Sequence, residues 1–468
     1  MEHLQQGVSE FDSYYNERDD DEKLAMLEIY KDYIEFSKQR GIESYSPSNR
    51  IIGICSYINK TEKLLEKYIE FHQSYKIYID DILNLSELHK LAGIRTVSGK
   101  LSEETYKRVN FQQNHNMPAI ITPQIIDRYY HSITVADYSL IIGLKIGLSQ
   151  TECLYLYLGG SLHDIGQSSL SHDGDAFLTD MGLPNHEDRS ISILYKFFDM
   201  NDAKKIYNII VNKDKAGLGK ILNITDTLVY IEQDCKAFQL CFDDSLAPRL
   251  VHAIESLDSD GNLIFNETKT VLELLEKRYI LHRSIYYAIR NKIRASATWN
   301  LLDIAINNGA LTRNSLLEKT PDDFITMIFQ NMRDNHNNTN MIKHEVITDL
   351  YEIYMGFKDI TIDPCWENIY IEKHSALKYF HLDKFNAKII RENIKEYISD
   401  DNEINHLILP IFPYKLSKTL KIKYRNENIE LCYNEPNFEL HNLGLIIFYP
   451  KQLSPKMNML KLSVENKR

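Results

Sequence analysis

The feature that most constrains the fold is a pair of apolar-periodic segments that ends at a histidine–aspartate dipeptide. Segments 125–148 and 150–162 place apolar residues three and four positions apart, which predicts two long amphipathic helices. His163 and Asp164 follow at once, and Gly166 favours a helix end there. Buried polar side chains at such a place need partners, so the dipeptide indicates a site rather than plain core.

The rest of the middle region extends the helical pattern. A small polar loop is expected at 167–171, and a Ser-Asp-Gly turn predicts a β-hairpin at 251–265. Further helices are expected at 190–201, 218–240 and 268–302. The predicted fold class is therefore mainly α, with an all-helical core that carries one small β-hairpin.

Length and composition predict flanking regions on both sides of this core. A chain of 468 residues is too long for one core, so two or three domains are expected. Residues 1–115 suggest short helices, 116–333 the helical core and 341–468 an α+β region, with a polar linker at 334–340. Three strand-like runs predict a small antiparallel sheet near the end of the chain, at 420–424, 429–433 and 443–449. Helices are expected between the linker and these strands, at 345–354 and 385–398.

Charge and cysteine usage exclude several classes of protein. The net charge of −12 disfavours binding to nucleic acid or to an anionic membrane, because that binding depends on Lys and Arg. No two of the six cysteines have CxxC spacing, so neither a zinc knuckle nor a redox motif is indicated. No apolar run approaches the roughly 20 residues that span a bilayer, and no signal peptide is expected. A cytoplasmic protein fits these features.

Two more residues extend the His163–Asp164 pair to a candidate metal site. His131 precedes the pair on one predicted helix, and Asp226 follows it on another. An isolated His-Asp dipeptide is more often a helix-terminal histidine beside a surface aspartate. The ordered set of two imidazoles and two carboxylates instead suits a divalent ion: Mn²⁺, Fe²⁺, Zn²⁺, Ni²⁺ or Mg²⁺. Such an ion would support hydrolysis of a phosphate ester.

This ordered set resembles the HD-domain metal phosphohydrolases, and the text RYYHS…LHDIGQSSLSHDGD resembles their deoxynucleoside triphosphate triphosphohydrolase branch. That branch includes bacterial dGTPases and the animal sterile-alpha-motif/HD enzyme. The resemblance covers about residues 120–330 and continues through DTLVYIEQD and EKRYILHRSIYY. It implies hydrolysis of a dNTP to deoxynucleoside and inorganic triphosphate.

The resemblance also implies roles for the residues that surround the metal ligands. His172 and Asp175 would form a proton-handling pair, and His186 would meet the phosphates. Gln167 departs from the animal pattern, which has His there, so only a binding role is expected of it. Thr227 is a second departure, since the animal pattern has Lys beside the ligand Asp226.

Two helical stripes are expected to bind the substrate. Tyr230 and Asp234 continue the face of Asp226 at spacing of four and would reach phosphates and the sugar 3′-hydroxyl. A second stripe has the same spacing and consists of Arg278, His282 and Tyr286. Its arginine suits phosphate, and the resemblance implies that its tyrosine packs under a deoxyribose. Arg128, one turn before His131, fits another phosphate contact.

The expectations about regulation and partners rest only on the resemblance to this family. The resemblance implies a tetramer or hexamer activated by dNTPs, but Arg290 and Lys292 stand in shifted positions, so no activator residues are carried over. The flanking regions are candidates for binding a protein partner, and a role in anti-phage defence follows the family pattern. Two alternatives remain at this stage: an HD phosphatase or phosphodiesterase, and a catalytically silent nucleotide sensor.

Overall fold

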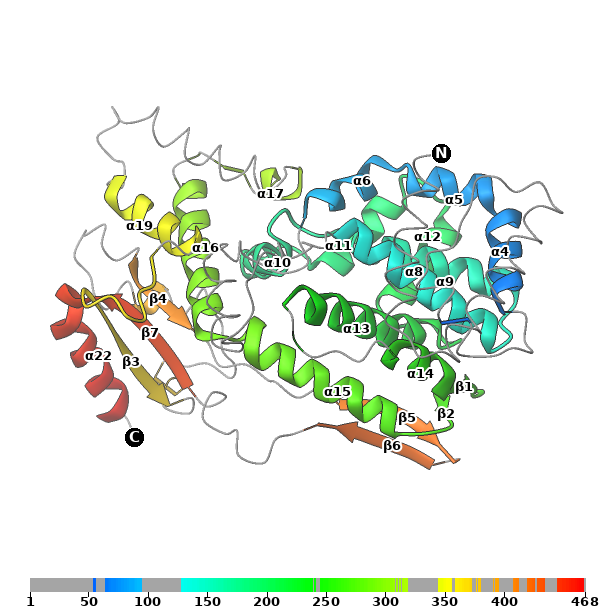
Figure 1. Ribbon diagram of the computed structural model, residues 1–468. Coiled ribbons are helices and arrows are strands. Elements are labelled where there is room, and N and C mark those ends of the chain that lie inside the picture. Colours follow the sequence, from blue (N-terminus) through cyan, green and yellow to red (C-terminus); the bar gives the residue numbers. More distant parts are fainter. Residues whose placement is uncertain are drawn as a thin grey trace, which may run out of the picture.

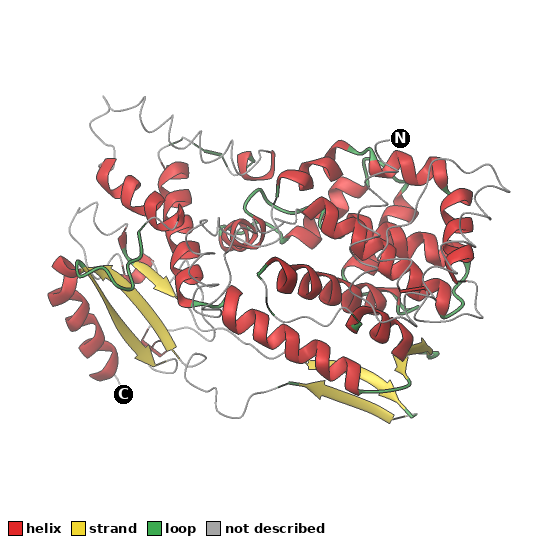
Figure 2. Ribbon diagram, viewed as in Figure 1, coloured by secondary structure: helices red, strands yellow, loops and turns green. Residues whose placement is uncertain are grey.

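The computed structural model supports a description of part of the chain, which the ribbon diagrams in Figures 1 and 2 show. The described residues are 54–55, 64–94, 128–238, 240, 245–307, 309, 311–312, 314–318, 344–355, 358–372, 376, 378–379, 390, 392–394, 407–411, 419–425, 427–433 and 444–466. Most of residues 1–115, where short helices are expected, the linker at 334–340 and most of the expected helix at 385–398 lie outside them. In the described part, no helix has the length and apolar character that crossing a membrane requires.

Helices α8 and α9 form the centre of the larger part of the molecule. The capping box of Ser149 and Glu152 starts α9, so its bounds of Gln150–Leu162 agree with the apolar spacing. Helix α8 (Arg128–Lys145) packs closely against it, because a Cβ on Gly160 would lie 2.5 Å from Ala136 Cα. The two helices can therefore approach closely beside His163, which follows α9.

Helices from both sides complete this core. The preceding helices are α4 (Leu64–Ser74), α5 (Lys76–Leu83), α6 (Ser86–His89) and η1 (Lys90–Gly93). The following helices are α10 (Ser171–Asp180), α11 (His186–Leu194), α12 (Met200–Ile210), α13 (Leu218–Ala237) and α14 (Leu246–Ala253). Buried apolar residues of α4, α8, α9, α12, α13 and α14 belong to one continuous cluster.

The helix expected at 190–201 is two helices in the structure. Helix α11 already begins at His186, where the Asn185 side chain accepts a hydrogen bond from the Asp188 backbone N–H. Asp199 caps α12 in the same manner, which starts a new helix where the apolar spacing indicated a continuous one.

The expected β-hairpin is present but begins later than predicted. Val251 belongs to α14, and the strands are β1 (Ile254–Leu257) and β2 (Leu263–Phe265). Two C-terminal strands, β5 (Thr419–Tyr424) and β6 (Glu427–Cys432), extend the hairpin to a four-stranded sheet of order β1-β2-β5-β6. Strand β5 pairs with β2 in parallel, whereas the other pairs are antiparallel.

The helix expected at 268–302 is interrupted. Helix α15 (Lys269–Leu281) passes into a π-helical turn, η2 (His282–Tyr286), and α16 (Ile289–Asn307) follows. Asn291 donates a side-chain hydrogen bond to the carbonyl of Ile285, which satisfies a carbonyl that this break releases from the helix. The break turns α16 away from α15 (Figure 1).

The remaining elements contribute to two smaller apolar clusters, one around α16 and one near the C-terminal end of the described residues. The helices there are α17 (Ser315–Glu318), α19 (His344–Met355), η4 (Lys451–Leu453) and α22 (Ser454–Asn466). The strands there are β3 (Trp366–Glu372), β4 (Leu409–Ile411) and β7 (Gly444–Pro450), in the order β3-β7-β4. The three predicted strand runs thus fall into two different sheets, because β7 pairs with β3 and β4 instead of β5 and β6. The mainly α fold with an α+β C-terminal region is confirmed.

Candidate metal centre

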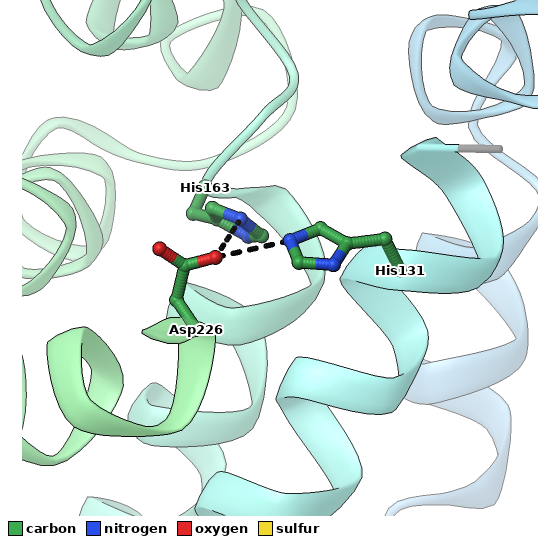
Figure 3. Close-up of side chains that lie close together, drawn as sticks. All are labelled: His131, His163 and Asp226. Atoms are coloured by element: carbon green, nitrogen blue, oxygen red, sulfur yellow. Dashed lines mark hydrogen bonds and ion pairs between the residues drawn. The ribbon is translucent and has the colours of Figure 1, made fainter. Parts of the chain in front are cut away.

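Three of the predicted ligands meet at one point in the helical core. His131 comes from α8, His163 from the residue after α9 and Asp226 from α13, as Figure 3 shows. One ligand atom of each lies within 4.8 Å of the others. The Nε2 atoms of His131 and His163 lie 3.0 and 3.6 Å from Asp226 Oδ1. These donor types are the ones that bind a divalent transition ion.

The protonation of His163 is fixed by its backbone partner. Its Nδ1 lies 2.7 Å from the carbonyl oxygen of Gly160, which can only accept, so Nδ1 carries the proton. When the ring carries only this proton, the lone pair is on Nε2, and within the described residues this buried atom has no hydrogen-bond partner. A buried nitrogen left in this state is what a bound ion would satisfy.

His131 is oriented by Gln233 in the same way. Its Nδ1 lies 3.1 Å from Gln233 Oε1, while the amide nitrogen of Gln233 faces the Thr134 hydroxyl at 3.4 Å. With Nδ1 as the donor, Nε2 directs its lone pair at the Asp226 carboxylate. Two electron-rich groups at 3.0 Å repel each other unless a proton or a metal ion lies between them.

The electrostatics of the cluster also require positive charge. Burial alone would lower the pKa of His163, but the charges of Asp164 and Asp226 outweigh it and raise the pKa to about 9. Burial would raise the pKa of Asp226, yet the two imidazoles hold it well below its usual range. A second proton on His163 can supply this charge, and a divalent ion that takes the place of that proton fits the same donor set.

Asp164, the fourth predicted ligand, lies beside this cluster and is held by Arg128. Its Oδ2 lies 3.5 Å from His163 Nε2 and accepts a hydrogen bond from Arg128 Nη1 at 2.5 Å. Burial acts to raise the pKa of Asp164, but the Arg128 charge holds it well below its ordinary value. Arg128 also donates to the hydroxyl of Ser171, at 3.2 Å from Nε and 2.8 Å from Nη2.

A cavity of about 880 Å³ opens over the cluster. Its walls include all four predicted metal ligands and most of the predicted substrate contacts. The latter are Arg128, Tyr230, Asp234, Arg278, His282 and Tyr286. Its size is in the range of small-molecule sites, and its lining mixes aromatic and charged groups.

Asp175 pairs with His186 in the structure, whereas the sequence suggested a pair with His172. His186 Nδ1 donates to Asp175 Oδ2 at 2.9 Å, and Arg189 Nη2 donates to Asp175 Oδ1 at 2.5 Å. The other ring nitrogen, Nε2, lies 3.9 Å from Asp164 Oδ1. His186 therefore lies between an orienting carboxylate and the metal cluster.

His172 lines the same cavity, and no carboxylate of the described residues forms a hydrogen bond or ion pair with its ring. Its ring lies 6.1 Å from that of His186, measured between centroids. His172 is exposed towards the cavity, and desolvation, with the Arg128 charge, lowers its pKa. A neutral His172 suits a hydrogen-bonding role near pH 7 better than proton donation.

The two predicted stripes meet at one wall of the cavity. The Tyr286 hydroxyl donates to Asp234 Oδ2, and the Tyr230 and Tyr286 rings lie 6.4 Å apart. His282 packs edge-on against Tyr286 at 4.8 Å, and its Nε2 lies 3.4 Å from the Tyr230 hydroxyl. These contacts depend on the π-turn, which brings His282 and Tyr286 to face α13.

The two departures from the family pattern have different surroundings. Gln167 is buried, and its Oε1 accepts from the Ser168 backbone N–H at 3.3 Å. Its Nε2 has no hydrogen-bond partner among the residues that the structure describes. It is not among the residues that line the cavity. Thr227 does line it, and its hydroxyl donates to the carbonyl of Asn223.

Sequence reasoning missed several residues that hold the site together. Gln233 orients His131, the Gly160 carbonyl orients His163, and Arg189 holds Asp175. Arg189 is 9% exposed, and its position one turn after His186 was the available signal. Tyr287 and Lys292 also line the cavity, just beyond the second stripe.

Comparisons with known proteins agree with this geometry. The family model described as the HD domain matches residues 128–239, which contain α8 to α13 and all four predicted metal ligands. No curated protein matches the sequence significantly. Among solved structures, a protein titled phosphohydrolase from Bacteroides thetaiotaomicron has a TM-score of 0.50 and 15% identity, over 79% of this chain and 95% of its own. The chain therefore carries an HD domain at residues 128–239.

Proposed function

We propose that this protein is a metal-dependent phosphohydrolase that splits a dNTP into deoxynucleoside and inorganic triphosphate. The observation that carries the proposal is the convergence of His131, His163 and Asp226 at the base of a large cavity. The HD domain and the fold shared with a phosphohydrolase support the general class of reaction. The specific substrate follows from the sequence resemblance and from the residues that line the cavity.

The chain's own groups can be given roles on this basis. When bound, a divalent ion would polarise a phosphoryl oxygen and lower the pKa of water. His131, His163 and Asp226 would hold it, with Asp164 beside them. His186, oriented by Asp175, would donate a proton to the departing oxygen through Nε2, and His172 would hydrogen-bond a phosphate.

The tyrosine wall supports a sugar-bearing substrate. The Tyr286 hydroxyl and Asp234 are paired at the cavity surface, where a sugar 3′-hydroxyl could exchange hydrogen bonds with them. The Tyr286 ring beside them would leave little room for a 2′-hydroxyl, which favours deoxyribose. A substrate with a phosphate chain and a deoxyribose would use both ends of the cavity.

Product analysis tests the proposal directly. The protein is incubated with each dNTP and NTP, singly and mixed, with Mn²⁺ or Mg²⁺, and the products are separated by ion-exchange chromatography. The expected products are deoxynucleoside and triphosphate, with none from Asp226→Asn. Release of orthophosphate would instead indicate a phosphatase, and inertness towards every dNTP under all these conditions would refute the proposal.

A further inference from the structure

Lys292 is a cavity-lining cation with no assigned role. Within the described residues, the cationic side chains that line the cavity are Arg128, Arg278 and Lys292. The two guanidinium groups follow from the family pattern, whereas Lys292 lies on α16, beyond the π-turn. The nearby basic residue Arg290 is engaged elsewhere, because its Nε lies 2.9 Å from Asp359 Oδ2.

The surroundings of Lys292 leave its ammonium group available to bind an anion. Its Nζ lies over the Tyr287 ring, 4.6 Å from the centroid. In the described part of the chain, the ammonium makes no hydrogen bond and no ion pair within 4.0 Å. By contrast, Arg128 already donates to Asp164 and Ser171. A cation held by an aromatic face beside a cavity is free to accept an anionic ligand.

Burial makes an anionic ligand favourable at this position. Desolvation lowers the pKa of Lys292, and the charge of Asp173 offsets this only in part. Asp173 follows His172 in α10, and its carbonyl accepts a hydrogen bond from Trp299 Nε1 of α16. Lys292 is therefore close to the start of α10, on the His172 side of the cavity.

The charges that line the cavity also favour a role for Lys292 in binding an anion. The described lining residues include five carboxylates: Asp164, Asp173, Glu187, Asp226 and Asp234. A triphosphate carries several negative charges and would be repelled by such walls unless cations face it. Thr227 brings no charge to the position beside Asp226, so a cation must come from another element.

We propose that Lys292 binds the terminal phosphates of the substrate, as a cation supplied by α16. This rests on the proposed function, because it assigns the phosphate chain of a nucleoside triphosphate to the His172 side of the cavity. The deoxyribose would then lie towards the Tyr286–Asp234 pair, and the α-phosphate at the metal cluster. Lys292 is a binding residue, and its charge distinguishes a triphosphate from substrates that lack the chain.

The first measurement uses binding alone. Sodium triphosphate is titrated by calorimetry into metal-free wild type, Lys292→Met, Lys292→Arg and Lys277→Met. Lys277 is the matched control, because it lies on α15 and outside the cavity lining. Loss of a charge-assisted contact is expected to weaken binding about 10- to 100-fold in Lys292→Met, with Lys292→Arg within a few-fold of wild type. Equal affinities in all four proteins, or no binding to wild type, would overturn the proposal.

The second measurement separates the phosphate chain from the reacting centre. In the metal-loaded enzyme, Lys292→Met is expected to raise the KM for a dNTP about 10-fold or more. Hydrolysis of bis(p-nitrophenyl) phosphate, which has no phosphate chain, is expected to stay unchanged. An equal loss on both substrates would overturn the proposal, since it would indicate general damage.

The two proposals fail in different ways. If wild type hydrolyses no dNTP, the proposed function fails, while a weaker affinity of Lys292→Met for triphosphate still supports an anion site. If dNTPs are hydrolysed and Lys292→Met leaves both KM and triphosphate affinity unchanged, only the Lys292 proposal fails. Melting curves of the variants show whether each is folded.

Discussion

Two histidine–aspartate contacts involve helix α8, and they behave in opposite ways. In the first, His131 of α8 faces Asp226 at 3.0 Å. In the second, six residues further along α8, Asp137 faces His72 of α4, with 3.8 Å between Oδ1 and Nε2. The side chain of Asp226 is 37% exposed and that of Asp137 is 17% exposed, and the two carboxylates also differ in their partners.

The number of imidazoles decides the charge state. Two imidazoles face Asp226 and hold its pKa well below its ordinary value, against the effect of burial. Burial raises the pKa of Asp137 to about 7, and a hydrogen bond from the Tyr68 hydroxyl at 2.7 Å opposes this only weakly. Burial lowers the pKa of His72 to about 3. At the first contact, Asp226 is ionised and favours a positive charge beside it. At the second contact, Asp137 keeps its proton and His72 stays neutral.

The largest expected effect tests the first contact. His163→Ala removes one of the two imidazoles that would hold the ion, so metal affinity and activity should both fall, activity on the order of 10³-fold. Metal content by mass spectrometry and the rate with Mn²⁺ measure this. His72→Gln is the matched change in the second contact and should keep metal and activity within a few-fold. Full metal occupancy in His163→Ala would contradict the assignment of the first contact to a metal site.

The next effect concerns the proton donor. His186→Ala should lower kcat about 10²-fold or more, because His186 has the carboxylate that orients it. His172→Ala should lower kcat less and raise KM. Steady-state kinetics on both variants decide this, with Asp175→Asn expected to follow His186→Ala. A larger kcat loss in His172→Ala would indicate that His172, and not His186, is the proton donor.

A smaller effect is expected from the residue that orients His131. Gln233→Leu leaves His131 Nδ1 without its acceptor, and loss of such a support typically costs about 10- to 100-fold in metal affinity. Competition with a chelator measures the affinity. The control is Gln73→Leu on α4, far from the ligands in sequence, with no expected change. An unaltered metal affinity in Gln233→Leu would show that α8 alone positions the ring.

The smallest expected effect concerns the second contact and is a pH dependence of the free energy of unfolding. The pKa of Asp137 is raised in the folded protein, so its stabilising contribution is complete below the unfolded value of 3.8 and is lost as pH rises through about 7. Asp137→Asn mimics the protonated acid and should lose nothing over that range. Relative to wild type, its free energy of unfolding should therefore rise between pH 5 and pH 8, on the order of 1 to 2 kcal/mol. Denaturant unfolding at both values measures this, and a constant difference would mean that Asp137 is ionised throughout.

The comparison also explains what the sequence could predict. The order of His131, His163 and Asp226 on helices predicted a cluster that the structure brings together, because each ligand position follows from a helix end or face. Helix α9 was predicted to the residue, since its apolar spacing and the Ser149 cap agree. Local signals were sufficient for this helix, whereas at 190–201 the local cap of Asp199 was missed and two helices were predicted as one.

Features that depend on two distant elements could not be predicted. Asp175 reaches His186 because the chain reverses between α10 and α11, while the sequence spacing favoured His172. The π-turn at His282–Tyr286 leaves no mark in a pattern that reads as one continuous helix. Strand periodicity predicted β5, β6 and the hairpin that contains β2, but not the pairing of β5 with β2, which lies more than 150 residues earlier.

The pairing of β5 with β2 determines where the chain can be truncated without loss of solubility. Strands β5 and β6 cover the open edge of the hairpin, and Lys423 of β5 forms an ion pair with Asp258 in its turn. Ile422 also fills part of the main apolar core. An HD fragment that stops before residue 419 would expose the backbone groups of β2 to any free strand, including that of another copy. Recombinant expression of the helical part alone should therefore yield aggregates, and supplying the 419–433 peptide should improve its solubility.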